Sequence, residues 1–171
     1  MIFFLNGSKL NIAKYHMKVI FLDFDGVLNN MHMIEPGLFC HKNMQNLRLL
    51  CEKTDAMFVL STSHRVYPLS LLQFENECHK YWLTDRTYGY TEYLYDSDNP
   101  ERPITLRVKE IKKWLSEHSE VDSWVVLDDM DMKIENIVKT DFAYGLTIAD
   151  VVKAIEILNG EEQTTCSDLH E

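Results

Sequence analysis

A buried strand that ends in two acids constrains this chain more than any other feature. The apolar run 19–22 is followed at once by Asp23, Phe24 and Asp25, and then by Gly26. Alternate residues of an extended chain face the same side, so the two carboxylates converge beyond the strand while Phe24 turns into the core. Gly26 permits a sharp turn of the backbone. Carboxylates this close repel unless a cation lies between them, which favours a divalent metal site; the alternative is a plain acidic turn.

Composition indicates a single globular domain in a reducing compartment. A chain of 171 residues with 46% apolar content can bury one core. The net charge of −10 opposes extended binding to nucleic acid or to an anionic membrane. The four cysteines have no paired spacing, so neither a zinc site nor a disulfide framework is indicated, and a cytoplasmic location fits. We expect one domain over residues 17–160, an N-terminal extension of open status over 1–16, and a disordered polar tail over 161–171.

Hydrophobic spacing predicts helices that alternate with short strands. Apolar residues on one face and capping residues define four helices. These are a helix through Met44, Leu47, Leu50 and Cys51; one from Pro68 to about His79 with Leu71, Leu72 and Cys78 inward; one capped by Thr105 with Val108, Ile111, Trp114, Leu115 and His118 on one face; and one capped by Thr147, with Ile148, Val151, Ile155 and Leu158 inward, that ends at Asn159–Gly160.

Short apolar runs predict further strands at 56–60, 124–127 and 137–139. The Tyr-, Asp- and Pro-rich stretch 80–103 is expected to be a loop or small hairpin at one edge of the domain. Strands and helices in this alternation predict an α/β fold, a doubly wound and mostly parallel sheet with helices on both faces. Ligands of such sheets bind beyond the carboxyl ends of the strands. Asp23 and Asp25, Ser61 to Ser63, and the pair Asp128 and Asp129 all stand at predicted strand ends.

The ordered set of these residues resembles the haloacid dehalogenase (HAD) superfamily, which carries four short motifs at the strand ends of a Rossmann-like sheet. The stretches 23–27, Ser61 after 58–60, a basic residue early in the third helix, and 125–129 resemble the four motifs in order. Residues 60–65, 107–115 and 145–147 further resemble the small HAD domains related to Swiss Army Knife RNA repair proteins, with His64 where that subgroup has tryptophan. The resemblance implies a domain with a minimal cap or none.

The resemblance also implies catalytic roles. Asp23 would be the nucleophile that forms an aspartyl-phosphate, and Asp25 the general acid and base. Mg²⁺ would bind Asp23, the backbone carbonyl of Asp25, and a carboxylate of the Asp128 and Asp129 pair, which of the two being left open. A basic side chain would neutralise the phosphate, and Ser61 would hydrogen-bond to it. The basic residue is either Arg107 or Lys109, and the substrate-binding set comprises Ser61, Thr62 and Arg65.

The predicted function is therefore a Mg²⁺-dependent phosphomonoester hydrolase. Only about 37 residues separate Asp23 from Ser61, and they hold a loop, a helix and a strand, so no large cap fits there. An open site suits a nucleotide, a polynucleotide end or another bulky phosphorylated substrate. The alternative is a metal- or phosphate-binding regulatory module that keeps the HAD fold without turnover. The sequence leaves the oligomeric state open.

Overall fold

Five parallel strands form one sheet in the order β3-β2-β1-β4-β5. The computed structural model describes residues 17–32, 39–98 and 100–160. The predictions for 1–16 and 161–171 lie outside these residues. Within them no helix has the length and apolarity needed to cross a lipid bilayer. The elements are β1 (Met17–Leu22), α1 (His41–Thr54), β2 (Met57–Leu60), the short 3₁₀ helix η1 (Ser63–Val66), α2 (Pro68–Lys80), β3 (Thr87–Tyr90), α3 (Pro103–Glu117), β4 (Val121–Asp128), β5 (Ile137–Lys139) and α4 (Ile148–Asn159).

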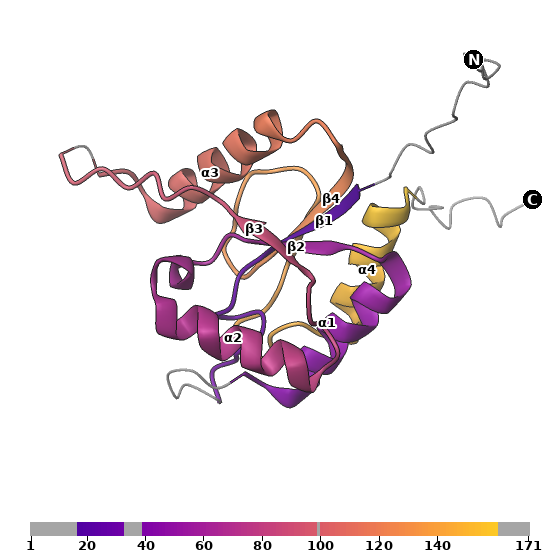
Figure 1. Ribbon diagram of the computed structural model, residues 1–171. Helices are drawn as coiled ribbons and strands as arrows, with labels where there is room; N and C mark the ends of the chain where they lie inside the picture. The colour runs from indigo at the N-terminus through magenta and orange to yellow at the C-terminus, as the bar shows by residue number, and fades with distance from the viewer. Residues whose placement is uncertain (1–16, 33–38, 99, 161–171) are drawn as a thin grey trace, which may run out of the picture.

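The helices cover the two faces of the sheet unequally. In Figure 1, α3 lies on one side of the strands, and α1, α2 and α4 lie on the other. Side chains of β1 alternate between the two cores: Ile20 and Leu22 pack on the three-helix side, whereas Val19 and Phe21 pack on the α3 side. This alternation follows from the two-residue period of a strand. The predicted α/β fold, a Rossmann-like sheet with helices on both faces, is confirmed.

The order of the strands reverses at β1. From β1 the chain proceeds through α1 to β2 on one side, and it later returns to place β4 on the other side of β1. In parallel α/β sheets the helices on either side of such a reversal diverge and leave a crevice at the carboxyl ends of the strands. The carboxyl end of β1 is therefore where the topology places a binding site.

Two helices bury different residues from those predicted. In α2, Leu72 is 52% exposed, and Phe74 is buried together with Cys78, four residues later on the same face. In α4, Ile148 is 53% exposed because it is the first helical residue, and Ala154 lies buried on the inward face instead. The prediction that these two residues, Leu72 and Ile148, face inward is wrong.

The stretch between α2 and α3 also differs from the prediction. It contains β3, an edge strand parallel to β2, and not only a loop or hairpin. Three of the four residues of β3 are exposed, because one side of an edge strand lacks a neighbour. Thr105 does not cap α3, which begins two residues earlier at Pro103 with Arg102 at the capping position. By contrast, Thr147 caps α4 in a capping box with Asp150, and Gly160 ends α4, as predicted.

Candidate active site

The strand register aligns the predicted site residues along the carboxyl edge of the sheet. Leu22 of β1 pairs with Leu60 of β2 and with Leu127 of β4. The next residue of each strand is therefore Asp23, Ser61 or Asp128, and these three stand side by side. Backbone hydrogen bonds hold the row together, since Asp23 N donates to Leu127 O at 3.1 Å and Ser61 N donates to Leu22 O at 3.0 Å.

Arg107 of α3 reaches this row from the α3 face and joins two of its acids. Its Nη1 donates to Oδ2 of Asp23 and, at 2.5 Å, to Oδ2 of Asp128. All three side chains are at least nine-tenths buried. Burial alone would lower the pKa of Arg107, but the two carboxylates outweigh it and raise the pKa above its usual value. Arg107 is therefore a fixed positive charge between the two strand ends.

A third carboxylate completes a candidate metal centre. Asp23, Asp128 and Asp129 each place one oxygen within 4.8 Å of the others. Even with Arg107 present, the four charged groups carry a formal charge of −2, so an oxygen-ligated divalent cation such as Mg²⁺ fits the donor set. The backbone makes room for this approach at Gly26, where an added Cβ would lie 2.7 Å from the Asp129 side chain. Gly26 also has φ +69°, a conformation that favours glycine.

Burial and the repulsion from Asp23 raise the pKa values of Asp128 and Asp129. The pKa of Asp128 rises to about 6, although Arg107 opposes the shift. A cation bound between the carboxylates would relieve this repulsion, because it stabilises the ionised form of each.

Asp25 lies beside this cluster, on the solvent side. Its Oδ2 is 2.8 Å from Nε2 of His64, and its Oδ1 accepts a hydrogen bond of 3.3 Å from Asn29. The His64 ring is held in turn by Ser70, 3.2 Å from Nδ1. The hydrogen bond from His64 lowers the pKa of Asp25, and the same contact raises the pKa of His64. The expected metal ligand at Asp25 is its backbone carbonyl, which stays a prediction.

Ser61 and Thr62 follow β2 and are both fully buried. The Ser61 hydroxyl has no hydrogen-bond partner among the described residues, a state that costs free energy in a folded protein unless a ligand or water completes it. Thr62 has a local structural contact, because its Oγ1 accepts from the backbone N of His64 and caps η1. Of the two, Ser61 has the hydroxyl that is free for an incoming group.

A family model for the HAD domain in Swiss Army Knife RNA repair proteins matches residues 19–151. The chain belongs to this HAD family. The matched range begins within β1 and ends in the first turn of α4, and it contains every residue of the predicted site. Membership indicates a phosphohydrolase type of function, and HAD domains typically use Mg²⁺. No curated protein and no solved structure matches the chain significantly.

The two basic candidates on α3 of this HAD domain occupy different places. Arg107 contacts Asp23 and Asp128, whereas Lys109 is exposed and its Nζ lies 2.5 Å from Glu101. The difference follows from helical geometry, because two residues along a helix rotate the side chain by about 200°. The geometry therefore places Arg107, and not Lys109, at the row of strand ends.

Arg65 is engaged within the HAD domain itself. Its Nη2 lies 2.6 Å from Glu110 of α3, and both side chains are 3% exposed. Its Nε donates to Thr91 O at 3.0 Å, and Nη1 donates to Thr62 O. An arginine with these contacts supports the loop after β2 and the chain after β3, and it does not project freely toward a substrate.

Sequence reasoning missed Glu110 and did not pair His64 with Asp25. A signal for Glu110 exists, since it lies three residues after Arg107 and one before Ile111, on the helix face that carries buried residues. A charged residue on such a face requires a buried partner. The contact between His64 and Asp25 spans 39 residues and has no local signal.

Proposed function

We propose that this HAD domain is a Mg²⁺-dependent phosphomonoester hydrolase that works through an aspartyl-phosphate on Asp23. The observation that carries the proposal is the position of Arg107 across Asp23 and Asp128, where Asp129 completes the carboxylate cluster. The Ser61 hydroxyl, which no described residue engages in a hydrogen bond, follows the neighbouring strand. An anion that enters this site meets a positive charge, a hydroxyl donor and a nucleophile at once. These are the groups that phosphoryl transfer requires.

The first step would transfer the phosphoryl group to Asp23. An Oδ atom of Asp23 forms a bond to phosphorus as the bond to the leaving alcohol oxygen breaks. The backbone N of Phe24 donates to Oδ1 of Asp23 at 2.8 Å and fixes the orientation of the carboxylate. Arg107 and the Ser61 hydroxyl would hold the phosphoryl oxygens. Their positive charge and hydrogen bond favour the transition state because the phosphoryl charge persists through transfer.

Asp25 would move the protons in both steps. It gives a proton to the leaving alcohol, and in the second step it takes a proton from the water that attacks the aspartyl-phosphate and releases inorganic phosphate. The hydrogen bond from His64 lowers the pKa of Asp25 and so favours its ionised form, the form that takes a proton from the attacking water. Asp25 is more than half exposed, so both groups also exchange protons with solvent.

Mg²⁺ bound by Asp23, Asp128 or Asp129 and the Asp25 carbonyl would cancel the repulsion between the acids and the phosphate dianion. At an effective dielectric constant of about 20, a unit-charge pair 4 Å apart is repelled by about 4 kcal/mol. Arg107 alone cannot offset three carboxylates. The donor set therefore argues for a metal requirement.

The substrate we propose is a nucleotide, a polynucleotide end or another bulky phosphate monoester. The family's association with RNA repair proteins supports a polynucleotide end. The net charge of −10 argues against contacts along an extended nucleic-acid tract, so the terminal phosphate would supply most of the electrostatic attraction.

Hydrolysis of p-nitrophenyl phosphate, nucleotides, and short oligonucleotides phosphorylated at the 3′ or 5′ end tests the proposal, with and without Mg²⁺. We expect metal-dependent release of phosphate that Asp23→Asn abolishes. Asp55→Asn is the matched control, because Asp55 is an exposed acid that follows α1 and pairs with Arg86. Turnover that survives Asp23→Asn contradicts the nucleophile, and metal and phosphate binding without turnover of any substrate favours the regulatory module.

A further inference from the structure

The buried ion pair of Arg65 and Glu110 binds the backbone of the chain that follows β3. Arg65 donates to the carbonyls of Thr91 at 3.0 Å and Glu92 at 3.3 Å, and Glu110 accepts at 3.0 Å from the backbone N of Leu94. The two charged side chains also bind each other at 2.6 Å. Three of four consecutive residues are thus held by one buried pair. We call residues 91–95 the arm root; beyond it the connection extends away from the body of the domain before α3 begins (Figure 1).

The arm root carries two exposed aromatic rings. Tyr93 and Tyr95 stack on each other with centroids 6.0 Å apart and an angle of 28° between the rings. The guanidinium of Arg65 lies over Tyr93, 5.4 Å from its centroid. Both rings nevertheless remain about half exposed, at 51% and 52%. A buried ion pair thus orders a segment whose tyrosines face solvent, an arrangement that folding alone does not require.

The arm root begins at the phosphate site. Tyr90 pairs with Leu60, and Thr91 N donates to Leu60 O at 3.0 Å, so Thr91 stands beside Ser61 in the row of strand ends. The hydroxyls of Thr91 and Ser61 are both buried and both lack a hydrogen-bond partner within the described ranges. The row of groups able to bind a substrate therefore continues from Asp23 through Ser61 to Thr91, and the two tyrosines follow directly.

We propose that Tyr93 and Tyr95 form a subsite that stacks the nucleobase next to the scissile phosphate. This inference rests on the proposed function and specifies its substrate as a nucleobase-bearing phosphate monoester. Aromatic side chains stack on any base, and stacking requires no positive charge. The surroundings match that mode of binding, because Asp96 and Asp98 follow the arm root directly, while Glu92 within it pairs with Lys113. Acids there disfavour a phosphate backbone but not the flat face of an unpaired terminal base.

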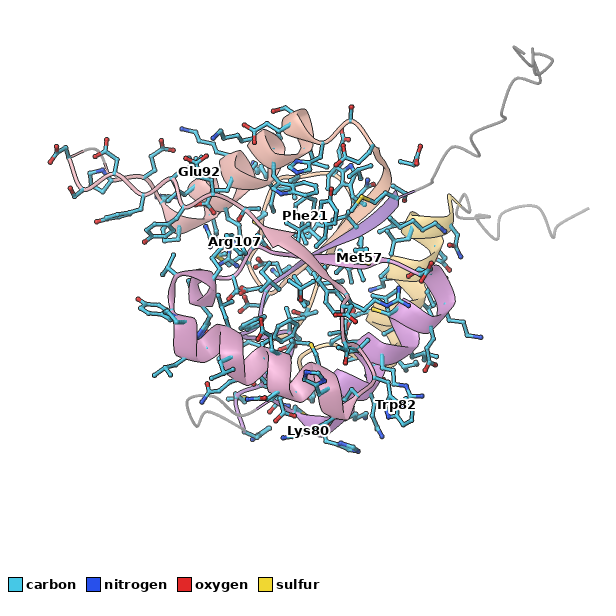
Figure 2. All side chains as sticks on the ribbon, viewed as in Figure 1. Phe21, Met57, Lys80, Trp82, Glu92 and Arg107 are labelled. Carbon is cyan, nitrogen blue, oxygen red and sulfur yellow. The ribbon has the colours of Figure 1, made fainter. Side chains whose placement is uncertain are left out.

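Figure 2 shows Arg107 and Glu92, which lies in the arm root, on one side of the molecule, and Trp82 on the other. Trp82 is 81% exposed and provides a matched control for the loss of an aromatic side chain. The comparison needs substrates that differ only in the base. A nucleoside monophosphate and the corresponding ribose phosphate form one such pair, and a short phosphorylated oligonucleotide extends the series.

The test is the ratio of kcat/KM for the nucleotide to kcat/KM for ribose phosphate in the full chain. We expect Tyr93→Leu and Tyr95→Leu each to lower this ratio about 5- to 100-fold, mainly through a higher KM for the nucleotide. Tyr93→Phe and Tyr95→Phe should keep the wild-type ratio, because a ring without the hydroxyl still stacks. Trp82→Leu should leave the ratio at the wild-type value.

A ratio that the leucine variants do not change would overturn the subsite even if the enzyme is an active phosphatase. If the leucine variants do lower the ratio, comparison of the oligonucleotide with the mononucleotide identifies the source of the base. A larger loss of kcat/KM for the oligonucleotide indicates a polynucleotide end. The two proposals fail separately. Without turnover of any phosphate the proposed function fails, and the subsite is then decided by fluorescence anisotropy of a labelled phosphorylated oligonucleotide, whose binding the leucine variants must weaken and the phenylalanine variants must not.

Discussion

Removing either partner of the buried pair between Arg65 and Glu110 should destabilise the domain strongly. Both side chains are 3% exposed, so a single substitution leaves the other charge without its partner and out of water. Such losses cost about 3–5 kcal/mol. Burial already lowers the pKa of Arg65, and Glu110 opposes that shift. Domains of this size have a free energy of unfolding of about 5–15 kcal/mol, so Arg65→Met or Glu110→Gln should lower Tm by about 10 °C.

Urea unfolding of a double-mutant cycle measures the effect. Because Arg65→Met with Glu110→Leu removes both charges, the double variant should be less destabilised than the sum of the single variants by about 2 kcal/mol. The exposed pair between Arg48 and Glu52 is the control, since its side chains are 43% and 52% exposed and Glu52→Gln should cost less than about 1 kcal/mol. Strictly additive single effects, or single losses as small as the control, would refute the reasoning.

Three further predictions concern the candidate site. Arg107→Met should abolish phosphatase turnover whereas Lys109→Met retains it, and equal losses in steady-state kinetics would contradict the assignment. Gly26→Ala should weaken Mg²⁺ binding in calorimetry and cost about 1–3 kcal/mol of stability, because a Cβ there collides with a carboxylate at 2.7 Å and the φ is positive. The pair of Asp25 and His64 should stabilise the metal-free fold by less than about 1 kcal/mol, since both are partly exposed. In the folded state the pKa of Asp25 is lowered from 3.8 and that of His64 is raised from 6.5, so the pair contributes fully between about pH 3.8 and 6.5. Its contribution to stability declines at lower and at higher pH. In unfolding measured as a function of pH, His64→Gln should remove this dependence.

The row of strand ends could be predicted because it depends only on where each apolar run ends in the sequence and on the parallel direction of the strands. Asp23, Ser61 and Asp128 each follow an apolar run, and parallel strands bring their carboxyl ends to one edge. The choice between Arg107 and Lys109 could not be made from sequence alone. It requires the rotation of α3 about its axis, which tertiary packing of Ile111 and Trp114 sets.

What the sequence could not reveal lies mainly around β3. Its residues Thr87–Tyr90 lack the apolar run that marks the central strands, because an edge strand with exposed side chains does not need one. The fastening of the arm root by Arg65 and Glu110 joins positions 45 residues apart, which local patterns do not encode. The prediction for Leu72 failed for a simpler reason, since Leu72 and Phe74 are both apolar and only packing decides which of them is buried.

The contacts that hold the arm root also determine where additional residues can be inserted into this domain. The contacts from Arg65 and Glu110 fall on residues 91–94, and Lys109 holds Glu101 on the way into α3. Extra residues inserted after Tyr95 would lengthen the connection without disturbing either attachment, since loop closure becomes only slightly costlier with length. That position is consequently the natural point for evolution, or for an engineer, to graft a lid or a binding module over the site.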